Sequence, residues 1–154
     1  MMFCIGYFAI INAICMISKR CGLRRVWYLE RAFDPARTSS GQYLWVREAG
    51  NLTRVKAGVT DVEDPVFEKL LPGDLVFWSG TYVPTDGRKV KVTHVGIYLG
   101  TEKKDRRPVM ACSTNGRSYR GRQSNGFGVY DFRVPSKKSK SKLIAFGTPP
   151  GFSK

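Results

Sequence analysis

The stretch "LLPGDLVFWSGTYVPTDGRKVKVTHVGIYLG" (residues 70–100) decides the expected fold of this chain. The composition of Pro72, Gly73 and Asp74 is typical of a turn. Two short runs rich in β-branched and aromatic residues follow, "LVFW" and "HVGIYLG", and this pattern predicts two strands joined by a polar loop. The only histidine of the chain, His94, stands at the start of the second strand. Any chemistry that needs an imidazole therefore depends on what this strand lies beside.

Three segments upstream of this stretch have helical character. In residues 21–33 apolar side chains recur at helical spacing, and residues 61–71 have a proline where a first turn tolerates one. Between them, residues 38–50 ("TSSGQYLWVREAG") carry Ser39 three positions before Gln42, which is the arrangement of a capping box, and end in glycine. We expect a helix in each segment, with Ser39 capping the second.

Strand-like runs dominate downstream of the opening stretch. The segments "PVMACS", "FGVYDFRV" and "LIAFG" are short, apolar and separated by Gly-, Asn- and Lys-rich connections. No strand alternates with a helix, so nothing predicts a parallel sheet. We expect an α+β fold in which residues 21–70 are mostly helical and pack on an antiparallel sheet built from residues 74–148.

Composition limits the partners of the chain. Its 154 residues suffice for one domain, and 26 Lys and Arg against 12 Asp and Glu give a formal net charge of +14. Such a surface attracts polyanions, whether nucleic acid, acidic lipid or an acidic cell-wall polymer, or it serves solubility alone. RNA-recognition, zinc-finger and homeodomain signatures are absent from the sequence. No specific nucleic-acid partner is therefore expected.

The cysteines offer one candidate nucleophile. Cys4, Cys15, Cys21 and Cys112 show no CxxC spacing, and one histidine cannot complete a common zinc set with them, so no structural metal is expected. A helix N-terminus favours a thiolate, and Cys21 stands where the first expected helix begins. His94 is the only imidazole that could exchange a proton with it. The residues alone leave open whether this is a catalytic pair or a buried thiol and a structural histidine.

The first 20 residues differ from the rest. "MMFCIGYFAIINAICMI" would span roughly 25 Å as a helix, at the lower limit for crossing a bilayer. Positive charges follow this run instead of preceding it, unlike a cleaved signal peptide. We divide the chain into an apolar segment, residues 1–20, and one domain, residues 21–154. Residues 1–18 are predicted to form an apolar helix outside the domain that could associate with a membrane; a core helix, or sequence not native to the domain, are the alternatives.

Two motifs carry a resemblance to a known family. "LLPGDLVFW" followed by "THVGIYLG" resembles the paired signature of the NlpC/P60 family of papain-like cysteine peptidases. "CGLRRVWYLERAFDPARTSSGQ" (residues 21–42) is similar to the family's cysteine helix and the Arg- and Ser-rich segment after it. The closing "LIAFGTPPGF" is also similar, so the likeness covers about residues 21–151.

The resemblance implies a papain-like fold and a role for specific residues. Cys21 corresponds to the family's nucleophile and His94 to its general base, while the third polar residue that orients the histidine falls near Cys112 and Asn115. The implied activity is hydrolysis of an amide in peptidoglycan stem or cross-link peptides, without a cofactor. The implied location is the bacterial cell envelope or the secreted fraction, with residues 1–18 as a candidate membrane anchor.

The cysteine motif departs from the family pattern on both sides. Arg20 stands where the family has an aspartate, and Gly22 follows Cys21 where the family has a serine. Those two side chains help to hold the substrate's amino end in the family. A catalytically inactive wall-binding or interaction module on the same fold is therefore the alternative function, and a nucleic-acid-binding protein is the third class considered.

Overall fold

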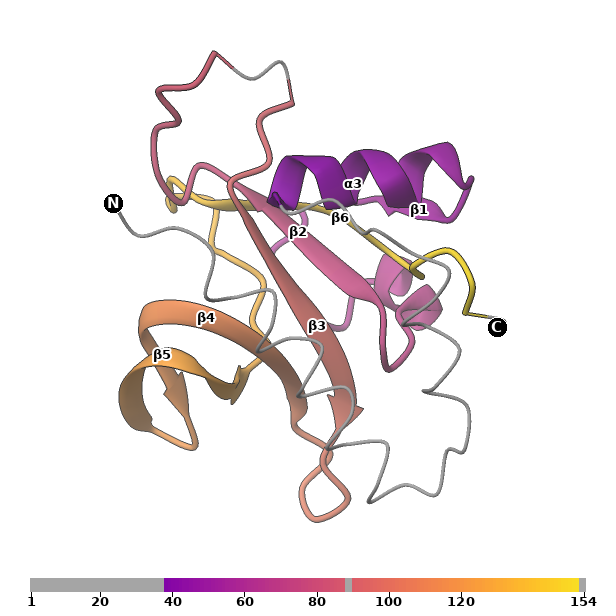
Figure 1. Cartoon of the computed structure of the whole chain (residues 1–154). Helices are drawn as coiled ribbons and strands as arrows, with labels where there is room; N and C mark the ends of the chain where they lie inside the picture. Colours follow the sequence, from indigo (N-terminus) through magenta and orange to yellow (C-terminus); the bar gives the residue numbers. More distant parts are fainter. Residues whose placement is uncertain (1–37, 88–89, 153–154) are drawn as a thin grey trace.

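A computed structural model describes residues 38–87 and 90–152 of the chain (Figure 1). The elements are, in chain order, the helix α3 (Ser39–Glu48), β1 (Leu52–Arg54), the 3₁₀-helix η2 (Pro65–Lys69), β2 (Leu75–Ser79), β3 (His94–Thr101), β4 (Pro108–Tyr119), β5 (Arg122–Asp131) and β6 (Lys142–Gly147). The first expected helix, in residues 21–33, and the apolar residues 1–20 lie outside the described part of the chain.

The strands form one antiparallel sheet in the order β1-β6-β2-β3-β4-β5. The α+β class is confirmed, as is the sheet expected from residues 74–148. The expected helical half is less helical than predicted, because residues 52–54 form a short strand and residues 61–71 contain only η2. Pairing with β6 gives residues 52–54 a partner that no local pattern announces. Among the described helices, none is long and apolar enough to cross a bilayer.

The helix α3 begins one residue earlier than the sequence indicates. Thr38 is its N-cap, and its Oγ1 accepts a hydrogen bond from the backbone N–H of Gly41 at 3.0 Å. Ser39 and the buried Ser40 instead donate their hydroxyls to the carbonyl oxygen of Val92, at 3.3 and 3.0 Å. These two bonds attach the start of α3 to the residues that lead into β3.

The turn before β2 is held by its own side chain. Gly73 has a φ of 97°, which favours glycine, and its N–H donates to the carbonyl of Tyr98 on β3. The buried carboxylate of Asp74 accepts from the N–H of Leu71 at 3.0 Å and from the hydroxyl of Thr148 at 2.7 Å. The "PGD" motif is therefore structural, and it aligns β2 with β3.

Apolar side chains cover the sheet on both faces. The helix α3 lies along the face near β1, β2 and β6 (Figure 1), which we call the α3 face. Its buried residues are Val46, Leu75, Phe77, Val92, Ile97, Ala111 and Ala145. The opposite face, which we call the His94 face, buries Val55, Phe67, Leu70, Val76, Trp78, Tyr98, Met110, Cys112, Tyr130, Phe132, Leu143 and Phe146. The segment around η2 thus covers the side of the sheet that α3 leaves open.

The strands β4 and β5 form a long, curved ribbon (Figure 1). Their register shifts between Thr114 and Arg117, and Gly116 within this irregularity has a φ of 71°. Such a bulge bends a strand and increases its twist. The bend matters because it determines where the side chains after Gly116 lie.

Candidate functional site

His94 opens β3 and lies directly across from Trp78 of β2. The two rings are 5.5 Å apart between centroids and inclined at 46°. Because Trp78 belongs to the core of the His94 face, the imidazole lies on the side of the sheet away from α3. The sequence-based prediction that a strand begins at His94 is confirmed.

Two buried polar atoms on this face have no hydrogen-bond partner in the described part of the chain. His94 Nε2 and Trp78 Nε1 are the only buried side-chain nitrogen or oxygen atoms without a hydrogen bond within residues 38–87 and 90–152. Burying such an atom unpaired costs on the order of 1 to 3 kcal/mol. Two of them, on neighbouring rings, identify this part of the sheet as the place where a polar partner would be most favourable.

Burial determines the charge of His94. Loss of solvent, and to a lesser extent the positive charge of Arg117, together lower the pKa of the imidazole from 6.5 to about 4. The ring is therefore neutral at pH 7, with one nitrogen able to accept a proton and the other to donate one.

Arg117 reaches this site from β4, beyond the bulge. Its guanidinium carbon lies 5.3 Å from the centroid of the Trp78 ring. Burial lowers the pKa of Arg117; the neighbouring Cys112 opposes this shift, and the charge of Arg133 adds to it. The sequence analysis missed this residue, because a bulge that returns a side chain to the core has no reliable local signal.

Cys112 and Asn115 are the two positions expected to supply the third polar residue. Cys112 is fully buried in β4, across from Gly96 of β3, where an added Cβ would lie 3.2 Å from the Cys112 Cβ. Burial raises the pKa of its thiol to about 11, with Arg117 opposing the shift in part. Asn115 is exposed and lies within the bulge. Neither side chain hydrogen-bonds His94, and a thiol with this pKa is not a nucleophile near neutral pH.

The candidate nucleophile Cys21 lies outside the described residues, as do Cys4, Cys15, Arg20 and Gly22. The structure therefore describes one half of the expected pair. Within the described ranges, no three His, Cys, Asp or Glu side chains gather closely enough to hold a metal ion.

No protein family, no curated protein and no solved structure matches this chain.

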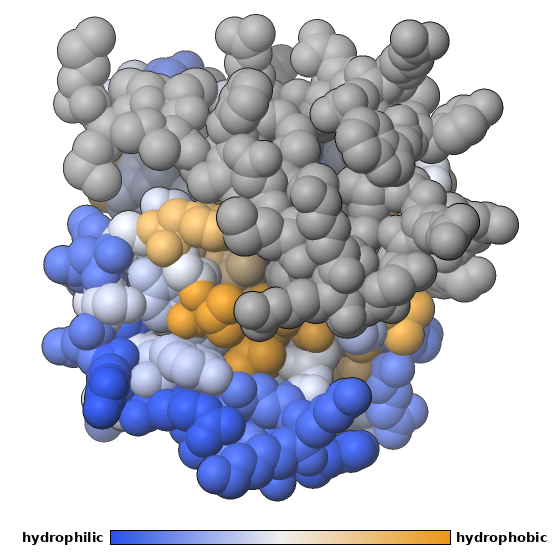
Figure 2. Space-filling model, turned by 60° about the horizontal axis from the view of Figure 1, so that its bottom comes forward, coloured by the Kyte–Doolittle hydropathy of each residue, from blue (hydrophilic) through white to orange (hydrophobic). Residues whose placement is uncertain are grey.

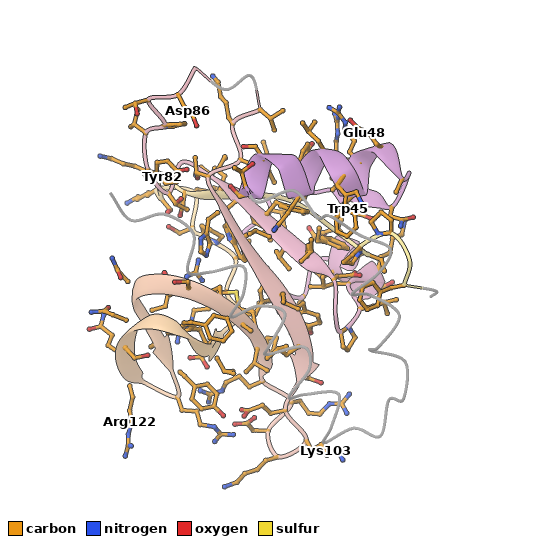
Figure 3. All side chains as sticks on the ribbon, viewed as in Figure 1. Trp45, Glu48, Tyr82, Asp86, Lys103 and Arg122 are labelled. Carbon is orange, nitrogen blue, oxygen red and sulfur yellow. The ribbon has the colours of Figure 1, made fainter. Side chains whose placement is uncertain are left out.

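Charge is unevenly distributed around the site. Residues 38–87 contain 4 Lys and Arg against 7 Asp and Glu, whereas residues 91–142 contain 13 against 3. Figure 2 shows hydrophilic side chains along the lower rim of the molecule and apolar ones toward its centre. In Figure 3, Lys103 and Arg122 point outward from the β3–β4 turn and from β5. The positive charge of the described chain thus belongs to the half that carries His94, β4 and β5.

Proposed function

We propose that this protein is a cysteine peptidase or amidase with a papain-like fold that hydrolyses an amide bond in peptidoglycan stem or cross-link peptides. The observation that carries the proposal is that His94 Nε2 and Trp78 Nε1, on two neighbouring rings, are buried without a hydrogen-bond partner among the described residues. An active site leaves such polar atoms available to hydrogen-bond its substrate, whereas a structural histidine is usually hydrogen-bonded within the protein. The resemblance of residues 21–42 and 70–100 to the NlpC/P60 motifs supplies the reaction class.

The chemistry follows from a thiol and a neutral imidazole. His94 accepts the proton of the Cys21 thiol, and the thiolate attacks the amide carbonyl carbon. The backbone N–H of Cys21 stabilises the resulting oxyanion. His94 then returns the proton to the leaving amine, and a thioester remains on Cys21. Water, deprotonated by His94, hydrolyses this thioester, which releases the acid and restores the thiol.

The low pKa of His94 has a consequence for this mechanism. A pKa of about 4 makes the free imidazole a weak base. A thiolate next to the ring, or an anion that neutralises Arg117, would raise that pKa toward the value that proton transfer requires. In the proposed enzyme, the pKa of His94 therefore rises when a thiolate or an anion is present in the site.

The same observation favours a second function, a noncatalytic wall-binding module on this fold. If nothing raises the pKa of His94, the imidazole cannot support a thiolate, and the altered cysteine motif with Arg20 and Gly22 is consistent with a lost activity. In either function the basic half of the chain attracts anionic wall polymers at the cell envelope or outside the cell. Association of residues 1–18 with a membrane belongs to this proposal as well.

A peptidoglycan stem-peptide assay tests the proposal. Cys21→Ala and His94→Ala should each abolish hydrolysis, while the matched variants Cys4→Ala and Cys15→Ala should retain it. Because the two groups act as a unit, the double variant should lose little more than either single one. Hydrolysis that survives in Cys21→Ala would refute Cys21 as nucleophile. If the unchanged chain neither hydrolyses the peptide nor reacts rapidly with iodoacetamide at Cys21, the noncatalytic function replaces the enzyme.

A further inference from the structure

The two edges of the sheet differ in length and protection. In the strand order β1-β6-β2-β3-β4-β5, the edge strands are β1 and β5. The strand β1 has 3 residues and lies beside α3, whereas β5 has 10 residues and forms the outside of the curved ribbon (Figure 1). A long unpaired edge can pair with another chain, and proteins usually prevent this with short edge strands, charged side chains or proline. The length of β5 gives it no such protection.

The edge strand β5 also lacks charge. Residues 123–130, "QSNGFGVY", contain no Lys, Arg, Asp, Glu or Pro, although 25% of the chain is charged and residues 91–142 are strongly basic. Asp131, which follows this run, is already paired with Arg133 at 3.1 Å. No side chain within the run therefore repels the approach of a second strand.

Backbone groups of β5 point alternately toward β4 and away from it. The N–H of Phe132 donates to the carbonyl of Pro108 at 2.9 Å, and the register between the strands is regular from Asp131 back to Phe127. The alternation of an antiparallel pair therefore directs the N–H and C=O groups of Phe127 and Val129 away from β4. Within the described ranges, no strand pairs with them on that side. Their side chains are 40% and 43% exposed, so both backbone and side chains are available.

We propose that this edge pairs with β5 of a second copy of the chain, antiparallel and about a two-fold axis at Gly128. An axis at Gly128 puts Phe127 of one copy opposite Val129 of the other, and the symmetry forms this pair twice. Each pair exchanges both of its N–H···O bonds, and its two apolar side chains lie against each other. The sheets of the two copies then form one continuous sheet.

The composition of the edge favours a second copy over a foreign segment. An acidic peptide is attracted to the basic residues elsewhere on the chain and finds no charge to select it on this edge. A second β5 presents an equally uncharged strand, and with the axis at Gly128 Asp131 lies opposite Asn125, so that no like charges face each other. A single pair of strands is a small interface, which predicts a weak dimer that forms at raised concentration.

The inference goes beyond the proposed function and does not depend on it. Because the two-fold axis is perpendicular to the sheet, the His94 faces of both copies lie on the same side of the joined sheet. Whatever His94 binds, the dimer presents two such sites toward one surface.

Sedimentation velocity of the full chain, under reducing conditions and over a wide range of concentration, tests the dimer. We expect an equilibrium between monomer and dimer that shifts toward the dimer as salt rises, because screening weakens the repulsion between two copies that each carry a net charge of +14. A complex bridged by a contaminating polyanion would instead dissociate as salt rises, and would overturn the proposal.

Two substitutions at one position disrupt the edge in different ways. Val129→Lys puts a lysine opposite Phe127 of the other copy, and Val129→Pro removes an outward N–H while it leaves the bonds between β4 and β5 intact. Each should weaken dimerisation at least about tenfold. Val83→Lys is the matched control, because Val83 is 87% exposed and lies between β2 and β3, where the same change of side chain and charge occurs away from β5. It should leave dimerisation unchanged.

Amide hydrogen exchange supplies the second readout. Exchange at Phe127 and Val129 should slow as the dimer forms, and exchange at Phe127 should stay fast in Val129→Lys. A dimer that persists in both Val129 variants forms through another surface, such as residues 1–18, and would overturn the proposal. A chain that stays monomeric at every concentration would overturn it as well. Slow exchange at both amides in that monomer would show that another segment of the same chain covers the edge.

Discussion

The α3 face and the His94 face of the sheet both bury large apolar side chains, but they differ in how their polar atoms are satisfied. On the α3 face, the buried hydroxyl of Ser40 donates to the Val92 carbonyl, and the ring of Tyr43 lies edge-on to Phe77 at 5.5 Å. On the His94 face, Trp78 Nε1 and His94 Nε2 are buried without a partner in the described chain. Folding alone requires only a face like the α3 face, on which the buried polar atoms are hydrogen-bonded.

The difference separates residues retained for stability from residues available for chemistry. Removing an apolar side chain from the α3 face leaves a cavity, whereas removing an unpaired polar atom from the His94 face removes a penalty. Functional sites are where proteins tolerate such a penalty. Measured stabilities should therefore divide along the two faces of one sheet.

The largest expected effect is the difference in the free energy of unfolding between the variants Phe77→Ala and His94→Leu. Phe77 is fully buried on the α3 face, so its truncation should lower the free energy of unfolding by about 3 to 5 kcal/mol. His94→Leu should change it by less than about 1 kcal/mol at pH 7, in either direction, because the lost imidazole had an unpaired nitrogen. Urea denaturation of both variants checks the comparison. A loss at His94→Leu as large as that at Phe77→Ala would show that His94 is structural.

The next effect, in size, is the pH dependence of stability. The unfolded chain binds a proton at His94 below pH 6.5, while the folded chain binds it only near pH 4, so the unfolded state holds more protons between these values. The free energy of unfolding should therefore fall as the pH is lowered from 6.5 toward 4, by about 2 to 3 kcal/mol from this group.

Comparison of the chain with His94→Leu isolates this contribution from that of the carboxylates, which titrate in both proteins. The difference in unfolding free energy between the two should grow in favour of His94→Leu as the pH falls through that window, and should level off below pH 4. Parallel pH profiles would mean that the imidazole is not buried in a neutral form, and the contrast between the two faces would weaken.

The sequence predicts those features that local patterns determine. Alternating and apolar runs located β2, β3 and β6 and the start of β3 at His94, and helical spacing located α3. It did not predict β1, whose residues 52–54 become a strand only through pairing with β6, nor the position of Arg117. Both depend on contacts between residues distant in the chain, and the second also depends on a bulge within β4.

The candidate site divides in the same way. His94 was identifiable because it is unique and stands in a recognisable motif, whereas the Trp78, Arg117 and Cys112 side chains around it meet through strand register and curvature. Register also puts Gly96, not His94, across from Cys112, so the expected third polar residue does not follow from strand order alone. Cys21 and its pairing with His94 stay predictions.

The smallest effect concerns the cap of α3, where the sequence favoured Ser39 and the structure has Thr38. Thr38→Ala removes the acceptor for the Gly41 N–H and should lower the free energy of unfolding by about 1 kcal/mol. Ser39→Ala is the matched control, since it removes only a long hydroxyl bond of 3.3 Å to Val92, while Ser40 keeps its own bond of 3.0 Å to the same oxygen. Ser39→Ala should therefore lower the free energy of unfolding by a few tenths of a kcal/mol at most.

Urea denaturation of the two variants shows whether Thr38 or Ser39 caps the helix. A larger loss at Ser39 than at Thr38 would restore the capping box that Ser39 and Gln42 indicate, and would contradict the attachment of α3 to the start of β3 through its serine hydroxyls.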